Sequence, residues 1–305
     1  MQSLVNNVLL QIESVVLGKP KQVRLALACL LAKGHILIED LPGMGKTTLA
    51  HILASSLGLS YQRVQFTSDL LPSDVVGISI FNTTSQSFEF HQGPLFNQVI
   101  LADEINRASP KTQSALLEAM EERQVSIDGQ THQLAAPFFV IATQNPLFHA
   151  GTYPLPESQL DRFMMKLSLG FPDRQAEKQI LLSPDQRDKF HPSDDNLTIE
   201  QLTSMQIAVE QVTVKESVLD YIISLCQVTR EANSQVNPLS PRAAKALLAA
   251  AKAWAFIDNR DYVLPDDIQA VFTAVCEHRM VNSDINVNAD VCQKILQQVD
   301  VLAFN

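Results

Sequence analysis

The chain has 305 residues, of which 46% are hydrophobic and 18% are charged, and its formal net charge at pH 7 is −10. This length is sufficient for two domains with their own cores or for one large domain, and the composition excludes a disordered chain. The negative charge disfavours an extended contact with a nucleic-acid backbone, although a local basic channel would be averaged out. We therefore expect a globular protein for which nucleic acid is not the default partner.

The cysteines and the first residues favour a cytoplasmic protein. Four cysteines without C-x-x-C spacing lie in apolar periodic segments, namely Cys29, Cys226, Cys276 and Cys292. This arrangement predicts buried free thiols in a reducing compartment. Residues 1–7 lack the features of a secretion signal, and the apolar run 25–32 is too short to cross a bilayer, so we expect no membrane insertion.

The first part of the chain follows the pattern of an α/β domain. Helical periodicity covers residues 3–33 with a break at 17–20, and apolar runs then alternate with helical segments. Near-continuous apolar strands between helices predict a parallel sheet that is covered on both faces. The predicted strands are Ile36–Glu39, Tyr61–Phe66, Gln98–Ala102, Pro137–Thr143 and Met164–Leu169, and the predicted helices are Thr47–Ser56, Pro110–Glu122 and Glu157–Asp161.

Two pairs of alternating runs interrupt this pattern and predict β-hairpins. One pair surrounds a polar turn within residues 77–92, and the other surrounds an Asp-Gly turn within residues 124–134. The first hairpin carries Phe81, Phe88 and Phe90. It either contacts a partner or only seals the edge of the sheet.

The remainder of the chain predicts an all-helical domain. Residues 183–195 are polar and contain prolines, which is typical of a linker. The predicted helices that follow cover about 199–211, 215–232, 241–257, 265–279 and 288–303. Ser240 is a good cap, and Pro241 and Pro265 suit the first position of a helix. The predicted organisation is an α/β core over 1–182, a linker over 183–195 and an all-α lid over 196–305.

A glycine-containing turn between the first predicted strand and the next helix is typical of a phosphate-binding loop. Glycines let backbone N–H groups converge on phosphate oxygens, and the helix adds its positive dipole end. Lys46 would reach the β- and γ-phosphates, and the Thr47 hydroxyl would bind Mg²⁺. Asp40 replaces the first glycine of the usual G-x-x-x-x-G-K-[ST] pattern, and the alternative is a plain turn with an exposed lysine. The candidate nucleotide-binding residues are Pro42, Gly43, Met44, Gly45, Lys46, Thr47 and Thr48.

The predicted strand 98–102 is followed by two carboxylates, Asp103 and Glu104. Beside a phosphate loop, Asp103 would hold the Mg²⁺ shell, and Glu104 would polarise a water for attack on the γ-phosphate. An acidic pair at a strand end is also common on surfaces, but its place after a phosphate loop favours catalysis. A kinase would need a hydroxyl-bearing acceptor, so the adjacent glutamate favours hydrolysis.

Three further residues complete the predicted site. Asn145 follows the strand 137–143 at the edge where such sheets bind ligands, and would contact the attacking water or the γ-phosphate, unless it only forms an Asn-Pro turn. Arg162 follows a helix at the rim and suits the γ-phosphate of a neighbouring subunit, the alternative being a surface ion pair. Arg242 lies in the first turn of a lid helix, where a phosphate would compensate its charge, the alternative being solvent exposure.

Together these motifs resemble the MoxR family of AAA+ ATPases. In that family Glu-Asp regularly replaces the glycine that starts the phosphate loop, so Asp40 supports the resemblance. Pro238-Leu239 departs from the Gly-Ala of many members. The resemblance covers residues 5–280, with matching segments at 37–47, 101–108, 113–120, 142–146, 161–163, 240–243 and 262–267.

The resemblance assigns roles to the residues of the nucleotide pocket. Lys46 and Thr47 match Walker A, and Asp103 and Glu104 match Walker B. The stretch that meets adenine in the family is matched by Val16, Leu17 and Gly18.

It also assigns the residues that sense the nucleotide. Asn145 is similar to sensor 1, Arg162 to an arginine finger that acts in trans, and Arg242 to sensor 2 acting from the lid in cis. The hairpin 77–92 resembles the helix-2 insert, and the hairpin 124–134 resembles the pre-sensor hairpin.

The resemblance implies Mg²⁺-dependent ATP hydrolysis in a hexameric ring, with ATP and Mg²⁺ as cofactors. Hydrolysis would drive chaperone-like remodelling or activation of a protein client, often together with a von Willebrand A domain adaptor. Two alternatives are an AAA+ motor acting on nucleic acid and a chelatase-like subunit for metal insertion. A small-molecule kinase is disfavoured because the finger acts in trans.

Overall fold

The computed structural model describes residues 1–146, 152–182, 197–231, 236–281 and 289–300. Two helices open the chain, α1 (Gln2–Val15) and α2 (Pro20–Leu31), and Pro20 occupies the first turn of α2. Gly18 lies between them with a φ of 71°. The predicted break at 17–20 is thus a turn that glycine and proline define.

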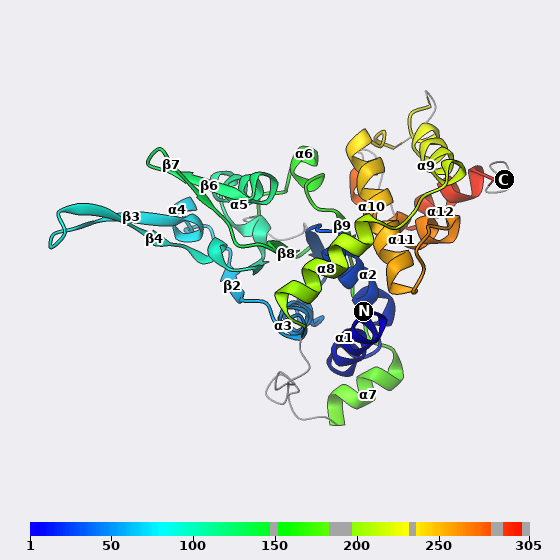
Figure 1. Ribbon diagram of the computed structural model, residues 1–305, viewed down its shortest axis with the longest axis horizontal. Coiled ribbons are helices and arrows are strands. Elements are labelled where there is room, and N and C mark those ends of the chain that lie inside the picture. Colours follow the sequence, from blue (N-terminus) through cyan, green and yellow to red (C-terminus); the bar gives the residue numbers. More distant parts are fainter. Residues whose placement is uncertain (147–151, 183–196, 232–235, 282–288, 301–305) are drawn as a thin grey trace.

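A five-stranded sheet forms the centre of the core (Figure 1). Its order is β2-β5-β8-β1-β9, and every neighbouring pair is parallel. This confirms the predicted α/β fold with a parallel sheet. The strands are β1 (Ile36–Glu39), β2 (Tyr61–Gln65), β5 (Val99–Asp103), β8 (Phe139–Gln144) and β9 (Met165–Leu167).

The sheet is covered on both faces, as its apolar strands predict. Ile36 and Ile38 of β1 belong to one buried cluster, whereas Leu37 between them belongs to another. Helix α3 (Lys46–Ser56) contributes to the first cluster and α5 (Pro110–Glu122) to the second. The short elements beside the sheet are α4 (Pro72–Val76), η1 (Pro94–Phe96), η2 (Ile105–Arg107) and α6 (Glu157–Leu160).

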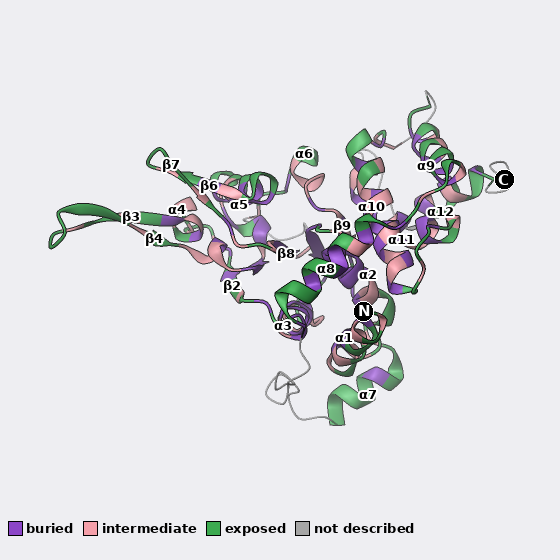
Figure 2. Ribbon diagram, in the orientation of Figure 1, coloured by how far each residue is buried: buried purple, intermediate pink, exposed green. Residues whose placement is uncertain are grey.

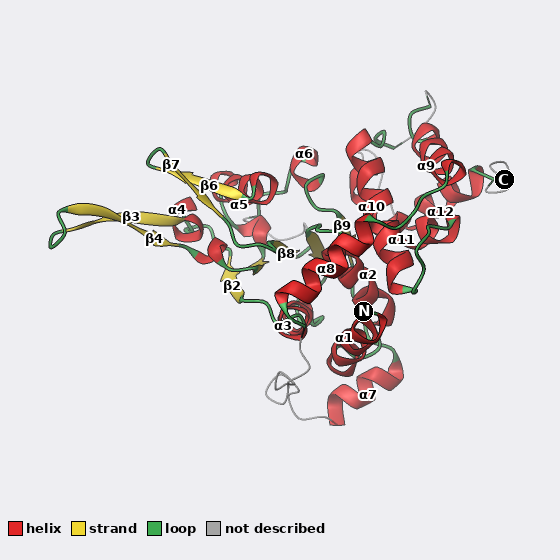
Figure 3. Ribbon diagram, viewed as in Figure 1, coloured by secondary structure: helices red, strands yellow, loops and turns green. Residues whose placement is uncertain are grey.

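Two hairpins project from the core at one end of the molecule (Figures 1 and 3). They consist of β3 (Gly77–Asn82) with β4 (Ser87–Gln92) and β6 (Gln124–Ile127) with β7 (Gln130–Gln133). Each hairpin is a two-stranded sheet of its own. The Phe90 ring of β4 stacks on His132 of β7 with centroids 4.2 Å apart, which ties the two hairpins together. The first hairpin therefore does not extend the central sheet as an added strand. Its contact with a partner stays a prediction.

The helices of the second half follow the predicted series. They are α8 (Ile199–Glu210), α9 (Glu216–Val228), α10 (Pro241–Ile257), α11 (Pro265–Met280) and α12 (Ala289–Gln298). Ser240 caps α10 by accepting a hydrogen bond from the Ala243 amide. Residues of these helices share one apolar cluster with α1 and α2, and Gln206 of α8 donates to the Leu30 carbonyl at 2.9 Å. The lid is thus joined to the N-terminal helices.

Helix α7 (Arg174–Leu182) follows the sheet and has no counterpart among the predicted helices. Figure 2 shows it as largely exposed, and Leu181 and Leu182 are 80% and 85% exposed. The predicted linker 183–195 lies outside the described residues. The four cysteines are buried and free, as predicted. Within the ranges given above, no helix has both the length and the apolar character needed to cross a membrane.

Candidate active site

The predicted phosphate loop connects β1 to α3. Gly43 and Gly45 have φ angles of 82° and 86°, in the left-handed region that favours glycine. A Cβ built on either glycine meets no atom within 4 Å, so the loop borders open space. Helix α3 begins at Lys46 directly after Gly45. This arrangement fits an anion, because a glycine-containing loop with open space beside it leads directly into a helix N-terminus.

Lys46 is buried at the carboxyl edge of the sheet. Its Nζ donates to the Asp40 carbonyl at 2.6 Å and to Asn145 Oδ1 at 2.9 Å. Burial lowers the pKa of the ammonium, and the nearby carboxylates, Asp40 first, oppose that effect. The lysine is thus held inside the loop, which contradicts the alternative of an exposed turn residue.

Asp103 ends β5 and is oriented by two neighbouring strands. Its Oδ1 accepts from the Thr143 hydroxyl of β8 at 2.6 Å. Its Oδ2 accepts from Arg63 of β2 through Nη2 at 2.6 Å and Nε at 3.0 Å. A carboxylate oxygen has two lone pairs, so these bonds leave acceptor capacity on Asp103 for a cation.

Glu104 leaves the sheet through a left-handed backbone conformation, with a φ of 56°. A non-glycine residue at this φ is held there by its surroundings and is often found at active sites. The Glu104 amide donates to the Thr143 hydroxyl at 2.9 Å. Its Oε2 accepts from Gln65 at 3.0 Å and from Arg107 at 2.9 Å. The other oxygen, Oε1, accepts from Asn145, so the Glu104 carboxylate is held at both oxygens.

The Asn145 amide links the phosphate loop to the acidic strand end. Its Oδ1 accepts from Lys46 Nζ at 2.9 Å, and its Nδ2 donates to Glu104 Oε1 at 2.8 Å. The parallel registers pair Glu39 with Gln144 and Gln65 with Asp103, so all these strands end at one edge. Three of the predicted site residues thus meet through one side chain.

Asp40, the departure from the usual loop pattern, anchors the segment that follows β9. Its carboxylate accepts from the Ser168 hydroxyl at 2.9 Å, from the Gly170 amide at 3.3 Å and from the Leu169 amide. Asp40 is 8% exposed and Leu169 is 2% exposed, so the Leu169 amide depends on this carboxylate for its acceptor. The residue therefore joins the phosphate loop to the chain that leads to α7.

Asp40→Asn should lower the free energy of unfolding by about 1–3 kcal/mol, because the new amide NH₂ would face the amide donors. Ser168→Ala, which removes one donor and leaves the acceptor intact, should cost only about 0.5–1.5 kcal/mol. Denaturant unfolding of both variants checks this order. Equal stability of Asp40→Asn and the natural protein would show that the contacts do not contribute.

The stretch predicted to meet adenine lies against the start of α7. A Cβ on Gly18 would lie 2.7 Å from the Ala176 Cβ, so only glycine fits there. Lys19 Nζ donates to the Phe171 carbonyl at 2.5 Å, and Val16 is buried. The structure thus places residues 16–18 beside the same segment that Asp40 anchors.

Arg162, which follows α6, and Arg242 of α10 both contact helix α5. Arg162 Nη1 donates to the Leu117 carbonyl at 2.5 Å, and Arg242 Nη2 pairs with Glu121. Leu117 and Glu121 are four residues apart, which places them one above the other on the helix. Both arginines therefore share one edge of the core.

The contacts of Arg242 bear on its expected role. Its Nε lies 3.8 Å from Asp161 Oδ2, in addition to the Glu121 pair. These two carboxylates compensate the charge at the start of α10, as a phosphate was expected to do. Within the described ranges, the contacts of Arg242 do not include the phosphate loop, so its action in cis stays a prediction.

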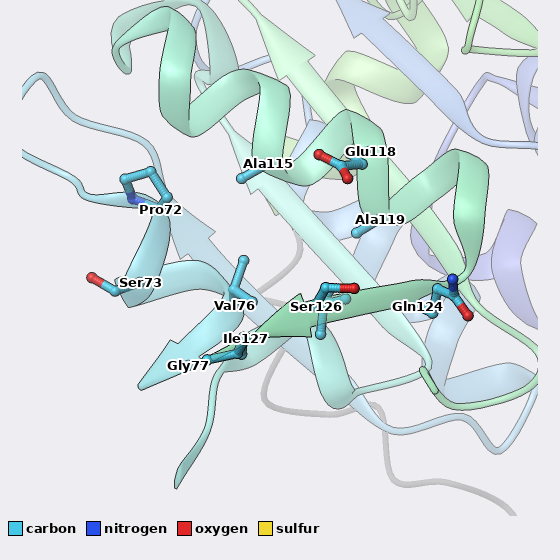
Figure 4. A pocket seen from close by; sticks show the side chains of 11 residues that line it. Pro72, Ser73, Val76, Gly77, Ala115, Glu118, Ala119, Gln124, Ser126 and Ile127 are labelled. Atoms are coloured by element: carbon cyan, nitrogen blue, oxygen red, sulfur yellow. The ribbon is translucent and has the colours of Figure 1, made fainter. Parts of the chain in front are cut away.

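A cavity of about 280 Å³ lies elsewhere, at the base of the hairpins (Figure 4). It lies between α4, α5 and β6, and Glu118 is the acidic residue on its wall. Its lining includes none of the predicted site residues. The cavity is therefore separate from the candidate active site.

The sequence patterns did not identify the cross-strand partners of the two acids. Arg63 and Gln65 lie two residues apart on β2, so their side chains point to the same face. Polar residues with this spacing on a strand next to the acidic one are a usable signal. Thr143 and Arg107 lie within the motif segments 142–146 and 101–108, and these motifs alone do not indicate that the two side chains contact the acids.

Two family models match the chain. The model of the ATPase family associated with various cellular activities (AAA) matches residues 35–165, and the AAA lid domain model matches residues 227–298. The parallel sheet, the phosphate loop and the acids after β5 agree with these matches. The protein is therefore an AAA ATPase with a nucleotide-binding core and a lid.

Curated relatives narrow this class. The chain is 37% identical to Chaperone MoxR1 of Mycobacterium tuberculosis, over 89% of this chain and 74% of the relative. It is 48% identical to the uncharacterized protein YeaC of Bacillus subtilis, over 88% of this chain and 84% of the relative. A crystal structure described as a candidate ATPase of Cytophaga hutchinsonii has a TM-score of 0.86 at 38% identity, covering 98% of this chain and 95% of that one. The chain belongs to the MoxR family of AAA+ ATPases.

Proposed function

We propose that this chain hydrolyses ATP with Mg²⁺ between neighbouring subunits and uses the reaction to remodel or activate a partner protein. The observation that carries the catalytic part is the Asn145 amide, which joins the Lys46 ammonium to the Glu104 carboxylate. This connection holds the phosphate-binding group and the water-activating group in a fixed relation.

The proposed roles follow from the contacts of each residue. Lys46 binds the triphosphate, and Thr47 and Asp103 hold the metal, since a hydroxyl and a carboxylate are ligands that Mg²⁺ prefers. When bound, Mg²⁺ neutralises charge on the transferred phosphoryl group. Glu104 orients and polarises the attacking water, and Asn145 keeps its carboxylate in place.

We assign Arg162 to the nucleotide of the neighbouring subunit, and Arg242 to the nucleotide of its own subunit, on which it acts from the lid. Both side chains contact α5, and the Arg242 side chain is 46% exposed. A site completed by the neighbour requires a head-to-tail contact, and such contacts form a ring when the rotation between subunits closes. The family resemblance favours a hexamer. In this proposal Arg162 acts across the interface, and Arg242 acts in cis from the lid.

A protein client is supported by the relatives and by the hairpins. The relative from M. tuberculosis is named a chaperone, and we extend this activity to the present chain as a proposal, with a von Willebrand A domain protein as adaptor. Phe81 and Phe88 near the turn of the first hairpin are 50% and 73% exposed, with ring centroids 5.3 Å apart. Exposed aromatic pairs suit contacts with other proteins. The buried free thiols favour a reducing compartment, so we place the protein in the cytoplasm.

Replacing Phe81 and Phe88 together by serine should leave stability and basal ATPase activity unchanged and weaken client capture, because the exposed rings are not needed for the core. The test uses two Glu104→Gln assemblies, one with Phe81 and Phe88 and one with serine at both positions. Each assembly is incubated in ATP with a lysate of the producing organism, and mass spectrometry compares the proteins that it retains. Clients should be retained by the assembly that keeps Phe81 and Phe88 and lost from the assembly that carries the two serines.

Phe90→Ala is the matched control. Its ring packs on His132 and Phe96, so its removal should lower stability, unlike the change at the exposed pair. Unchanged client capture after loss of Phe81 and Phe88 would move the coupling element elsewhere. Collapse of the ATPase activity in the same variant would make the hairpin part of the architecture.

A further inference from the structure

The last turn of α11 in the lid holds the segment that carries Arg162. Arg279 is buried there, with its side chain 5% exposed. Its guanidinium donates to Asp161 Oδ1 at 2.7 Å and to the backbone carbonyls of Asp161 at 3.2 Å, Phe163 at 2.8 Å and Met164 at 3.1 Å. One side chain of the lid thus contacts the residues on both sides of Arg162.

The chemistry of these contacts requires arginine. A planar guanidinium offers five donors in a fixed fork, whereas the single ammonium of a lysine cannot reach four acceptors at once. The Asp161 carboxylate is shared, because its Oδ2 also faces Arg242 Nε of α10 at 3.8 Å. Two lid helices therefore meet at one carboxylate next to the finger.

A second contact fixes the same segment. His278 is 2% exposed, and its Nε2 lies 3.1 Å from the Phe163 carbonyl. The Phe163 side chain is fully buried in the core cluster beneath α5. The backbone at Arg162 is therefore held between the core on one side and α11 on the other, while its guanidinium points to the Leu117 carbonyl of α5.

We propose that Arg279 is a positioning residue that fixes the Arg162 finger to the lid of its own subunit. A change in the angle of the lid then moves the finger that this subunit offers to its neighbour. The inference rests on the proposed function, because it requires Arg162 to act on the neighbouring nucleotide. A purely structural joint would instead affect the pocket of the subunit that contains it.

Mixed assemblies separate these two roles. In a mixture of Lys46→Ala and Arg162→Ala subunits, the active site combines the pocket of the Arg162→Ala subunit with the finger of the Lys46→Ala subunit. Arg279→Lys is introduced into one of the two partners at a time. In the finger donor it should lower the kcat of the restored ATPase by about tenfold or more with little change in KM, since misplacement of a transition-state group lowers kcat. In the pocket donor it should leave most of the restored activity.

Arg24→Lys is the matched control. Arg24 is likewise an arginine that joins the lid to the rest of the subunit, since it contacts Asp258 and the Trp254 ring from the N-terminal helix α2. In the described structure it contacts no residue of the segment that carries Arg162. It should leave the restored activity similar in both placements. Asp161→Asn, which removes the carboxylate that Arg279 binds, should reproduce the asymmetry of Arg279→Lys and serves if that variant does not fold.

The outcomes distinguish the positioning role of Arg279 from the action of Arg162 in trans. Equal loss in both placements, or no loss in the finger donor, overturns the positioning role of Arg279 alone. No restored activity in the parent mixture, with mixed assemblies verified by native mass spectrometry, overturns the finger in trans and this inference with it. Loss confined to the finger donor supports both.

Discussion

Replacing Glu104 by glutamine should leave ATP binding intact and slow hydrolysis by about 10²-fold or more. Glutamine keeps the shape of the side chain and an oxygen that can accept from Asn145. It loses the negative charge that polarises the attacking water and the second acceptor that Gln65 and Arg107 contact. Phosphate release at saturating ATP and equilibrium binding of ATP measure the two effects separately.

Two controls define this result. Lys46→Ala should lose tight ATP binding, because the charge-assisted contact to the triphosphate is removed. Chelation of divalent cations should stop hydrolysis by the natural protein, and added Mg²⁺ should restore it. Comparable turnover in the Glu104→Gln variant and the natural protein would contradict the assignment of Glu104 as the water-activating group.

Arg162→Ala should retain nucleotide binding near normal and lose most of its hydrolysis, with a loss on the order of 10³-fold. The reason is that its own pocket keeps Lys46, Glu104 and Asn145, while the neighbour loses the cation that stabilises transition-state charge. Mixing this variant with Lys46→Ala should restore part of the activity. Steady-state phosphate release across a series of mixing ratios measures the recovery.

An exposed arginine away from this edge provides the comparison. Arg174 lies at the start of α7 and is exposed, so Arg174→Ala should leave hydrolysis unchanged. If assemblies containing both inactive subunits show no recovery, Arg162 acts within its own subunit or only stabilises the fold. Recovery in the same mixtures would fix its action across the interface.

The elements of the core could be predicted where local signals and burial agree. Helix α5 has the predicted bounds because Ser109 caps it and Pro110 starts it. The strands of the central sheet are within two residues of their predicted ends. Burial of apolar runs accounts for this in β1, β5 and β8, whereas β2 is mostly exposed. Helix α7 was missed because its apolar residues Ile180, Leu181 and Leu182 do not form a buried face.

The site could be predicted as far as strand ends determine it. Lys46, Asp103, Glu104 and Asn145 meet because parallel strands end at one edge. The partners that orient them depend on register and on contacts between distant segments. Arg242 shows this limit, because its compensating carboxylate on Glu121 lies 121 residues away in the chain. Local reasoning about the helix dipole identified the need for an anion but not its source.

The contacts of Asp40 change what an apparently corrective substitution would do. An engineer who aligned this loop with the usual pattern would consider glycine an improvement at this position. Asp40→Gly would instead remove the acceptor shared by the Ser168 hydroxyl and the Leu169 and Gly170 amides. The damage would therefore arise at the connection between the sheet and α7. A motif search that requires the first glycine would also exclude this chain, although Asp40 at that position has a structural role. Its carboxylate holds the segment that follows β9.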